Sequence, residues 1–189
     1  MDIARKSLLA SAGCAALIGT AAFVESASSA PPDKHTVKVP GGLAFSEFRG
    51  YETWEVVSVS HNATAIAVIV GNPAMIAAYK AGIPANGKPV PDGAKMAKVH
   101  WMPKKNEFFP DAIVPGAQQD VDFMVKDSKR FGDVGGWGYA FFKYDAATDT
   151  FMPATTSDTP PQGNDAKCGV ACHTIAKKRD FVFTEYGHK

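Results

Sequence analysis

Two cysteines and a histidine near the carboxyl end have the types and the spacing that attach a haem to a polypeptide. They lie in the segment Cys168-Gly169-Val170-Ala171-Cys172-His173. Two neighbouring thiols can each add to a vinyl group of haem, and a histidine directly after the second thiol is then held under the iron as an axial ligand. The segment therefore predicts one haem c, attached through Cys168 and Cys172, with His173 bound to the iron.

The two cysteines are separated by three residues, whereas the usual attachment motif is C-x-x-C-H. In a helix, one extra residue rotates the first cysteine by about 100° relative to the histidine. Gly169 lies inside the insertion, and glycine adopts backbone angles that other residues avoid. We therefore expect the extra residue to bulge at Gly169, so that Cys172-His173 keeps its geometry.

Two other uses of these residues remain open. Cys168 and Cys172 can form a short-loop disulfide in an oxidising compartment, or they can supply part of a zinc site together with His173. A zinc site of this kind would lack an obvious fourth ligand nearby. A third alternative for the whole chain is a secreted β domain without haem.

Residues 1–30 have the pattern of a signal peptide. Arg5 and Lys6 form a basic start, residues 8–24 are apolar or small, and small side chains precede a cleavage site after position 30. The apolar run is short and rich in alanine and glycine for a membrane span. Cleavage removes Cys14 and leaves two cysteines, as expected where haem is attached outside the cytoplasm. We expect a periplasmic protein with no stable membrane span.

The rest of the chain suits one domain. The 20 basic and 19 acidic residues of the full sequence give a net charge near +1, and the two signs are mixed along the chain. This pattern does not favour a nucleic-acid partner. Residues 31–44 are polar and contain proline, which predicts a flexible lead-in with little structure. Residues 45–189 are long enough for a single domain with its own core.

Strand patterns outnumber helix patterns, which predicts an α+β, β-rich fold: an antiparallel sheet with a few helices and the haem near the C-terminus. A helix is expected from Asn72, a capping residue, to Gly82, and a second one from Asp165 through the cysteines to the basic residues 177–179. The loops are expected at 103–116 and 145–164. The strands are expected at 54–60, 63–70, 94–102, 121–126, 137–144 and 181–184.

One predicted strand carries polar residues on a single face. Because side chains alternate along residues 94–102, Met96, Lys98 and His100 share a face, opposite Ala97 and Val99. Met96 or His100 is then a candidate sixth ligand of the iron, which would make the protein an electron-transfer cytochrome with a six-coordinate haem. His100 is alternatively a distal base or hydrogen-bond donor, or a strand histidine without a role in the site.

The chain resembles the cytochrome P-460 family and its relative cytochrome c-prime-beta. The resemblance lies in GYETWEVVSVSH, VIVGNPAMIAAYKAG, PDGAKMAKVHW, VPGAQQDVDFMVKDSKRFGDVGGWGYAFF and CGVACHTIAKKRDFVF, and it covers most of the chain after residue 30. It implies a β-rich fold, often a homodimer, with a c-type haem whose open axial site binds small nitrogen species or other diatomic gases. Some members oxidise hydroxylamine and carry a covalent link from a lysine to the haem ring, and the lysine at the matching place here is Lys98.

The resemblance leaves the reaction open. Hydroxylamine oxidation needs a proton acceptor near the ligand, for which Glu107 and Asp122 are candidates. A gas-binding site needs only an open and apolar distal face, which phenylalanines can form. An electron-transfer partner in the periplasm is a further expectation. Candidate phenylalanines for the distal face are Phe45, Phe48, Phe108 and Phe109, and candidate partners of the haem propionates are Arg130 and Arg179.

Overall fold

Residues 33–37, 39, 41–154, 166–167 and 169–187 are described by the computed structural model of the chain. The predicted signal peptide, the predicted helix cap Asp165 and the first attachment cysteine, Cys168, lie outside the described residues. Residues 31–189 group as one unit by their contacts. Within the described part of the chain, no helix has the length and the apolar character needed to cross a membrane.

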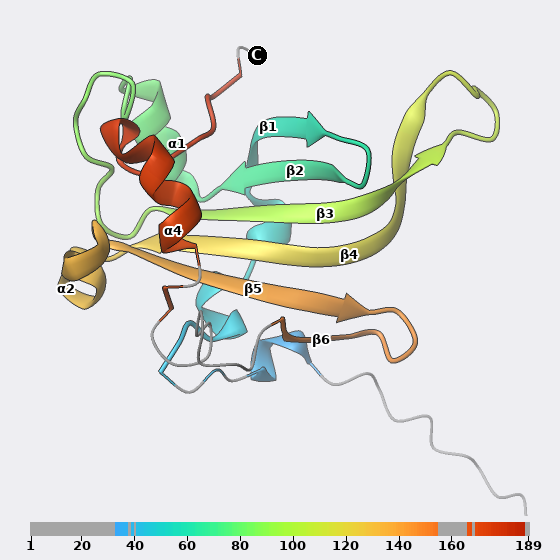
Figure 1. Ribbon diagram of the computed structural model, residues 1–189, viewed down its shortest axis with the longest axis horizontal. Coiled ribbons are helices and arrows are strands. Elements are labelled where there is room, and N and C mark those ends of the chain that lie inside the picture. Colours follow the sequence, from blue (N-terminus) through green and yellow to red (C-terminus); the bar gives the residue numbers. More distant parts are fainter. Residues whose placement is uncertain (1–32, 38, 40, 155–165, 168, 188–189) are drawn as a thin grey trace, which may run out of the picture. The chain divides into compact units, whose positions relative to one another are not determined.

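A six-stranded antiparallel sheet organises this unit, with the strands in chain order β1-β2-β3-β4-β5-β6 (Figure 1). Each strand pairs with the next along the chain, so the sheet is a meander. The predicted β-rich α+β fold with an antiparallel sheet is confirmed. The strands are β1 Glu55–His61, β2 Ile66–Gly71, β3 Lys95–Lys105, β4 Ile113–Lys126, β5 Trp137–Asp145 and β6 Thr150–Pro153.

The helices are short. Helix α1 begins as predicted, with the Asn72 side chain accepting a hydrogen bond from the Met75 backbone N–H at 3.0 Å and with Pro73 in the first turn. The α-helices are α1 Pro73–Lys80, α2 Ser128–Phe131 and α4 Val170–His173. The 3₁₀ helices are η1 Lys34–Thr36, η2 Phe45–Phe48, η3 Tyr51–Thr53, η4 Gly132–Val134 and η5 Thr174–Arg179.

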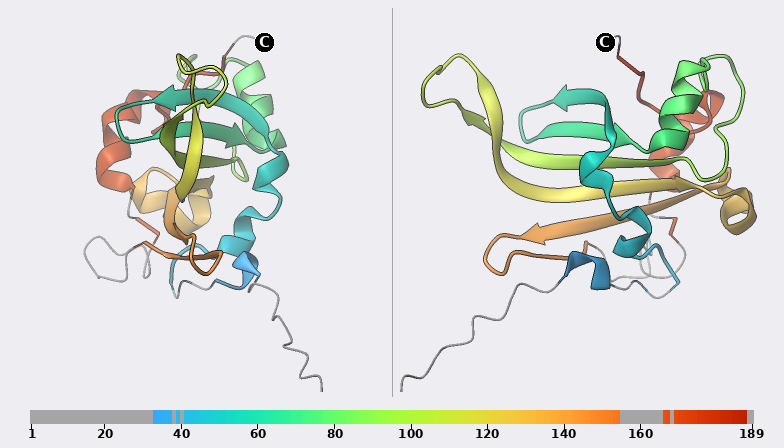
Figure 2. Two further views of the ribbon diagram at one scale, coloured as in Figure 1. Left: turned by 90° about the vertical axis from the view of Figure 1, so that its right-hand side faces the viewer. Right: turned by 180° about the vertical axis from the view of Figure 1, so that it is seen from behind.

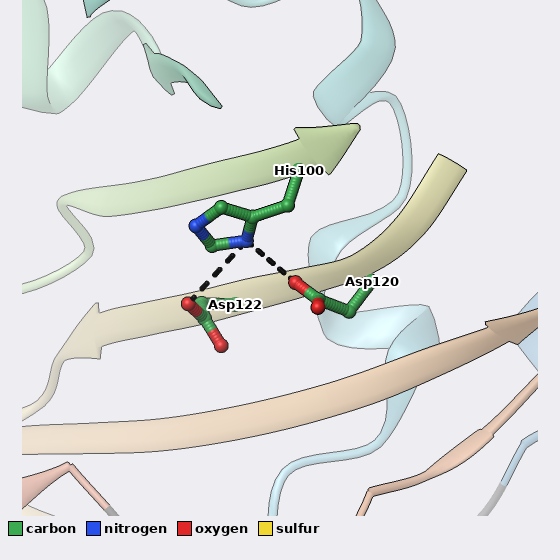
Figure 3. Close-up of side chains that lie close together, drawn as sticks. All are labelled: His100, Asp120 and Asp122. Carbon is green, nitrogen blue, oxygen red and sulfur yellow. Dashed lines mark hydrogen bonds and ion pairs between the residues drawn. The ribbon is translucent and has the colours of Figure 1, made fainter. Parts of the chain in front are cut away.

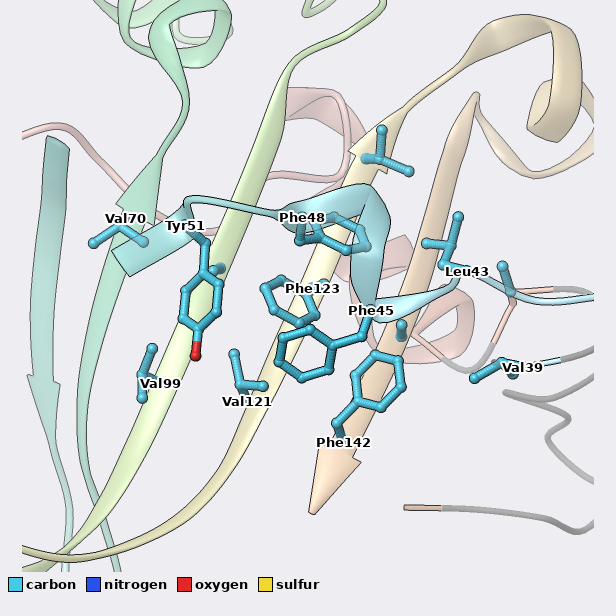
Figure 4. Packing of buried hydrophobic residues seen from close by; sticks show 14 of the residues in the cluster. Val39, Leu43, Phe45, Phe48, Tyr51, Val70, Val99, Val121, Phe123 and Phe142 are labelled. Carbon is cyan, nitrogen blue, oxygen red and sulfur yellow. The ribbon is translucent and has the colours of Figure 1, made fainter. Parts of the chain in front are cut away.

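The amino-terminal segment with η1 to η3 covers one face of the sheet (Figure 2). Its aromatic rings pack on the inward side chains of β4 and β5, as Figure 4 shows. Phe48 stacks on Phe123 with ring centroids 4.1 Å apart, and Phe45 meets Phe142 at 4.9 Å. The described part of residues 31–44 is not the unstructured lead-in that we expected, because Leu43 is fully buried in this core. Leucine at this position gains free energy by leaving water, and this outweighs the turn-forming composition around it.

The other face of the sheet carries α4 and a second core cluster. Met96, Met124 and Tyr139 lie side by side on β3, β4 and β5 and are buried there. Met75 of α1 and Val182 after η5 belong to the same cluster. Figure 1 shows α1 and α4 near one end of the sheet.

Three predicted loops or strands differ from the structure. Strands β3 and β4 extend into the predicted loop 103–116, where Pro103 and Pro115 face each other in the register. Strand β6 forms within the predicted loop 145–164. Residues 181–184 are not a strand, because Phe181 has a left-handed φ of +64° that no extended strand allows.

Candidate functional site

His173 is the last residue of helix α4, and one of its ring nitrogens has a hydrogen-bond partner. Its Nδ1 lies 2.7 Å from the backbone carbonyl oxygen of Phe181. A carbonyl oxygen can only accept, so Nδ1 carries the proton, and in the neutral ring Nε2 keeps its lone pair. A histidine that binds a metal usually donates its other N–H to a carbonyl or carboxylate in this way. The Nε2 atom of His173 is therefore left available to bind a metal ion.

The surroundings of His173 keep its ring neutral and fixed. Burial lowers the pKa of His173, and the positive charge of Lys98 lowers it further, while the Phe181 carbonyl opposes both effects. The ring packs against Tyr139 and Phe183, with centroid distances of 4.8 Å and 5.0 Å. A neutral imidazole is the form that binds a metal ion, so these contacts agree with the predicted role of His173.

The attachment segment is positioned by close packing at Gly169. Cys172 precedes His173 in α4, and it is exposed. Gly169 has ordinary helical angles of φ −88° and ψ −10°, so the expectation that it bulges through special backbone angles is wrong. Glycine is needed there for a different reason: a Cβ atom on Gly169 would lie 2.4 Å from Cδ1 of Tyr139. The ring of Tyr139 thus supports both Gly169 and His173.

The sheet face beside His173 is ordered in rows across β3, β4 and β5. The first row is the buried Met96–Met124–Tyr139 set that α4 covers. In the next row Lys98, Asp122 and Phe141 lie opposite one another in the strand register. Because cross-strand partners point to the same face, Lys98 lies one row from Tyr139 and hence near His173. Its effect on the pKa of His173 agrees with that placement.

A cluster of three polar side chains occupies the following part of this face (Figure 3). His100 Nδ1 lies 2.5 Å from Asp120 Oδ1 and 3.8 Å from Asp122 Oδ2. Their ligating atoms all lie within 4.8 Å of one another. His100 and Asp122 were candidates from the sequence. Asp120 was missed because it lies one residue before the predicted strand 121–126; its spacing of two residues from Asp122 was the available signal.

The Asp122 carboxylate of this cluster can exchange a proton near neutral pH. Burial raises the pKa of Asp122 to about 6; the charges of His100 and Lys98 oppose this rise, while that of Asp120 adds to it. A carboxylate with such a pKa is a suitable general base at pH 7, because it is ionised yet basic enough to take a proton. The cluster of His100, Asp120 and Asp122 also has the ligand types for a cation, but the direct contact of His100 with Asp120 satisfies both groups without one.

Other residues suggested by the sequence do not join this site. Phe45 and Phe48 lie in the core on the opposite face of the sheet. Glu107, Phe108 and Phe109 are exposed in the turn between β3 and β4, and Phe108 is 92% exposed.

Three further candidates are held by other partners. The Met96 side chain is buried in the second core cluster, where the Tyr79 hydroxyl approaches its sulfur at 4.0 Å. Arg130 and Arg179 form ion pairs with Glu47 and Glu185, each at 2.7 Å.

A cavity of about 710 Å³ lies elsewhere, between α1, the loop after it and the carboxyl-terminal tail. Its lining includes Tyr79, Tyr186, Arg179 and Glu185, whereas His173 and Lys98 are not among the residues that line it. The rings of Tyr79 and Tyr186 stack with centroids 5.6 Å apart. Charges of both signs line this cavity, and no ligand class follows from them.

The comparisons with known proteins bear on the whole domain. A sequence profile described as Cytochrome P460 matches residues 48–184. This range includes β1 to β6, Lys98, the His100 cluster and the attachment segment. No curated protein sequence shows a significant match. The matched range covers well over half of the chain, and it contains residues that fit a c-type haem. The chain belongs to the cytochrome P460 family.

Proposed function

We propose that this protein is an exported mono-haem cytochrome whose open axial site binds small nitrogen species, nitric oxide and hydroxylamine among them. Cys168 and Cys172 attach the haem, and His173 is its axial ligand. When bound, the haem would supply an iron centre that can take a small ligand. The observation that carries this proposal is the His173 ring, whose Nδ1–H is held by the Phe181 carbonyl so that Nε2 is left for iron.

A gas-binding or ligand-binding role is favoured over electron transfer. An electron carrier would need Met96 or His100 as a second strong ligand. Met96 is buried among core side chains, and Nδ1 of His100 contacts Asp120. Burial therefore removes Met96 as an iron ligand, whereas Nε2 of His100 stays available, so an electron carrier would have to use His100.

Hydroxylamine oxidation is supported by a second observation, the acid–base cluster beside Lys98. Removal of protons from a bound nitrogen ligand needs a positioned acceptor. Asp122, with its pKa raised to about 6, is a suitable acceptor, and its own partly exposed side chain can return the proton to solvent. Lys98 is the residue that would form the family's link to the haem ring. The expected homodimer, the periplasmic location and a redox partner remain parts of this proposal.

The proposal is tested on holoprotein made in a host that matures cytochromes c. An open axial site predicts a high-spin spectrum without added ligand and a changed spectrum after nitric oxide is added. A low-spin spectrum that nitric oxide does not change would favour the electron carrier instead.

The ring link is tested by Lys98→Ala, with Lys104→Ala as the control from the exposed end of the same strand. If Lys98 is linked to the ring, the reduced wild type has a strongly red-shifted Soret band that Lys98→Ala abolishes and Lys104→Ala retains. An identical spectrum in all three proteins would refute the link.

A further inference from the structure

One buried lysine contacts the segment that follows the helix carrying His173. Lys126, the last residue of β4, is 5% exposed, and it is the buried charged residue among those that the structure describes. Its Nζ donates to both carboxylate oxygens of Asp180, at 2.8 and 2.9 Å, and to the Gly135 carbonyl at 2.9 Å. The ring of Trp137 lies 5.2 Å from the same ammonium group. All three N–H donors of Lys126 are therefore used.

The partner of Lys126 lies in an unusual turn. Asp180 and Phe181 have φ angles of +48° and +64°, a left-handed conformation that residues other than glycine rarely adopt. Two such residues in succession persist only where their surroundings hold them. Aspartate adopts this conformation more readily than most residues, but phenylalanine does not, so tertiary contacts must stabilise the turn at Phe181.

Several contacts hold the turn at Asp180. The carboxylate accepts from Lys126 and from the Val90 backbone N–H at 2.7 Å. The Asp180 carbonyl oxygen accepts from the indole N–H of Trp137 at 2.8 Å. The Phe181 ring packs so closely on Gly135 that a Cβ atom there would lie 2.2 Å from it. The turn is thus tied to the end of β4 and the start of β5.

The same turn supplies the acceptor for His173. The Phe181 carbonyl, one peptide unit after Asp180, accepts the Nδ1–H of His173 at 2.7 Å. The direction of that carbonyl depends on the left-handed angles of Asp180 and Phe181. A turn with ordinary angles would point the carbonyl elsewhere, and His173 would lose its partner.

We propose that Lys126 and Asp180 are positioning residues for His173: their ion pair holds the Asp180-Phe181 turn, and the turn aims the Phe181 carbonyl at Nδ1. This inference rests on the proposed role of His173 as the haem ligand. A hydrogen bond from Nδ1–H makes an imidazole a stronger donor to its metal. Loss of the ion pair therefore weakens donation from His173 to iron, without any change in the residues that face the bound ligand.

The test removes both charges together, in Lys126→Met with Asp180→Asn. A single replacement would leave one charge buried without its partner and would endanger folding. The asparagine oxygen can still accept from the Val90 N–H. Asp133→Asn is the control, because it removes an exposed charge, paired with Lys167 at 2.9 Å, from the segment just before Gly135. The readouts are the iron–histidine stretching band in resonance Raman spectra of the reduced protein and the reduction potential.

In the double variant we expect the iron–histidine band to move to lower frequency and the reduction potential to become more positive, while the control matches the wild type. A haem-loaded double variant with the band of the wild type would overturn the inference alone. If the double variant takes up no haem, Trp137→Phe replaces it, since this change removes the donor to the Asp180 carbonyl. In Trp137→Phe, a shift of the iron–histidine band to lower frequency supports the inference, and a band at the wild-type frequency overturns it. A wild type without haem would overturn the proposed function, and the inference with it.

Discussion

Replacing Gly169 by alanine places a methyl group where the Tyr139 ring already lies. The added Cβ would be 2.4 Å from Cδ1 and 2.6 Å from Cγ of that ring, about 1 Å closer than an ordinary contact allows. Tyr139 is buried, and it also supports the ring of His173, so it cannot turn aside without disturbing the site. The strain must therefore move either α4 or the tyrosine.

The expected cost follows from this overlap. Overpacking a well-packed site by one carbon costs about 1–3 kcal/mol. For a domain of this size, each kcal/mol lowers the melting temperature by about 2–4 °C, so we expect Gly169→Ala to lower it by roughly 2–12 °C. Thermal unfolding followed by circular dichroism measures this change. The iron–histidine band of the holoprotein should also shift, because α4 carries His173.

Gly132→Ala is the matched control for this measurement. Gly132 has comparable helical angles, φ −58° and ψ −31°, and a Cβ there would meet nothing within 4 Å. Alanine at such a position restricts the unfolded chain and stabilises by about 0.4–1 kcal/mol. If Gly169→Ala proved as stable as Gly132→Ala, the packing of Tyr139 on the attachment segment would be refuted.

Three further predictions concern the core and the acid–base cluster. Phe45→Ala should lower the free energy of unfolding by about 3–5 kcal/mol, because this fully buried ring fills the first core cluster. Phe108→Ala, at an exposed position, should change it by less than about 0.5 kcal/mol. Urea unfolding measures both variants, and equal effects would argue against the placement of η2. The rate of hydroxylamine oxidation should fall as the pH is lowered through about 6, because Asp122 becomes protonated there. Asp122→Asn should be slower by about 10²–10⁴-fold at pH 7 and should lack this pH dependence. A variant with the rate profile of the wild type would remove Asp122 from the mechanism. A raised pKa also means that the folded protein binds this proton more tightly than the unfolded chain does, so stability from this group should rise as the pH falls from 7 toward 4, and Asp122→Asn should abolish that part of the pH dependence of unfolding.

The sheet could be predicted well from local patterns. The alternation of Met96, Lys98 and His100 with Ala97 and Val99 placed the two sets on opposite faces, as the register and burial show. The start of α1 followed from Asn72 and Pro73, whose roles depend only on neighbours in the chain. Such features are local, so the sequence contains all the information that they need.

The errors arose where distant contacts decide the structure. Phe181 was expected in a strand, but its left-handed turn is held by Lys126 and Trp137, which are more than forty residues away in the chain. Gly169 was expected to adopt backbone angles that other residues avoid, but glycine is needed there because the Tyr139 ring leaves no room for a Cβ atom. The role of Asp120 depends on the register between β3 and β4, which no local pattern fixes.

The central claim is the covalent capture of a haem at the carboxyl end, and intact-mass measurement tests it most directly. Protein exported by a host with a cytochrome c maturation system should be coloured and should have the mass of the polypeptide after residue 30 plus one haem. Replacement of both Cys168 and Cys172 by serine should abolish that added mass. A colourless wild-type product with the mass of the bare polypeptide would contradict the proposed function.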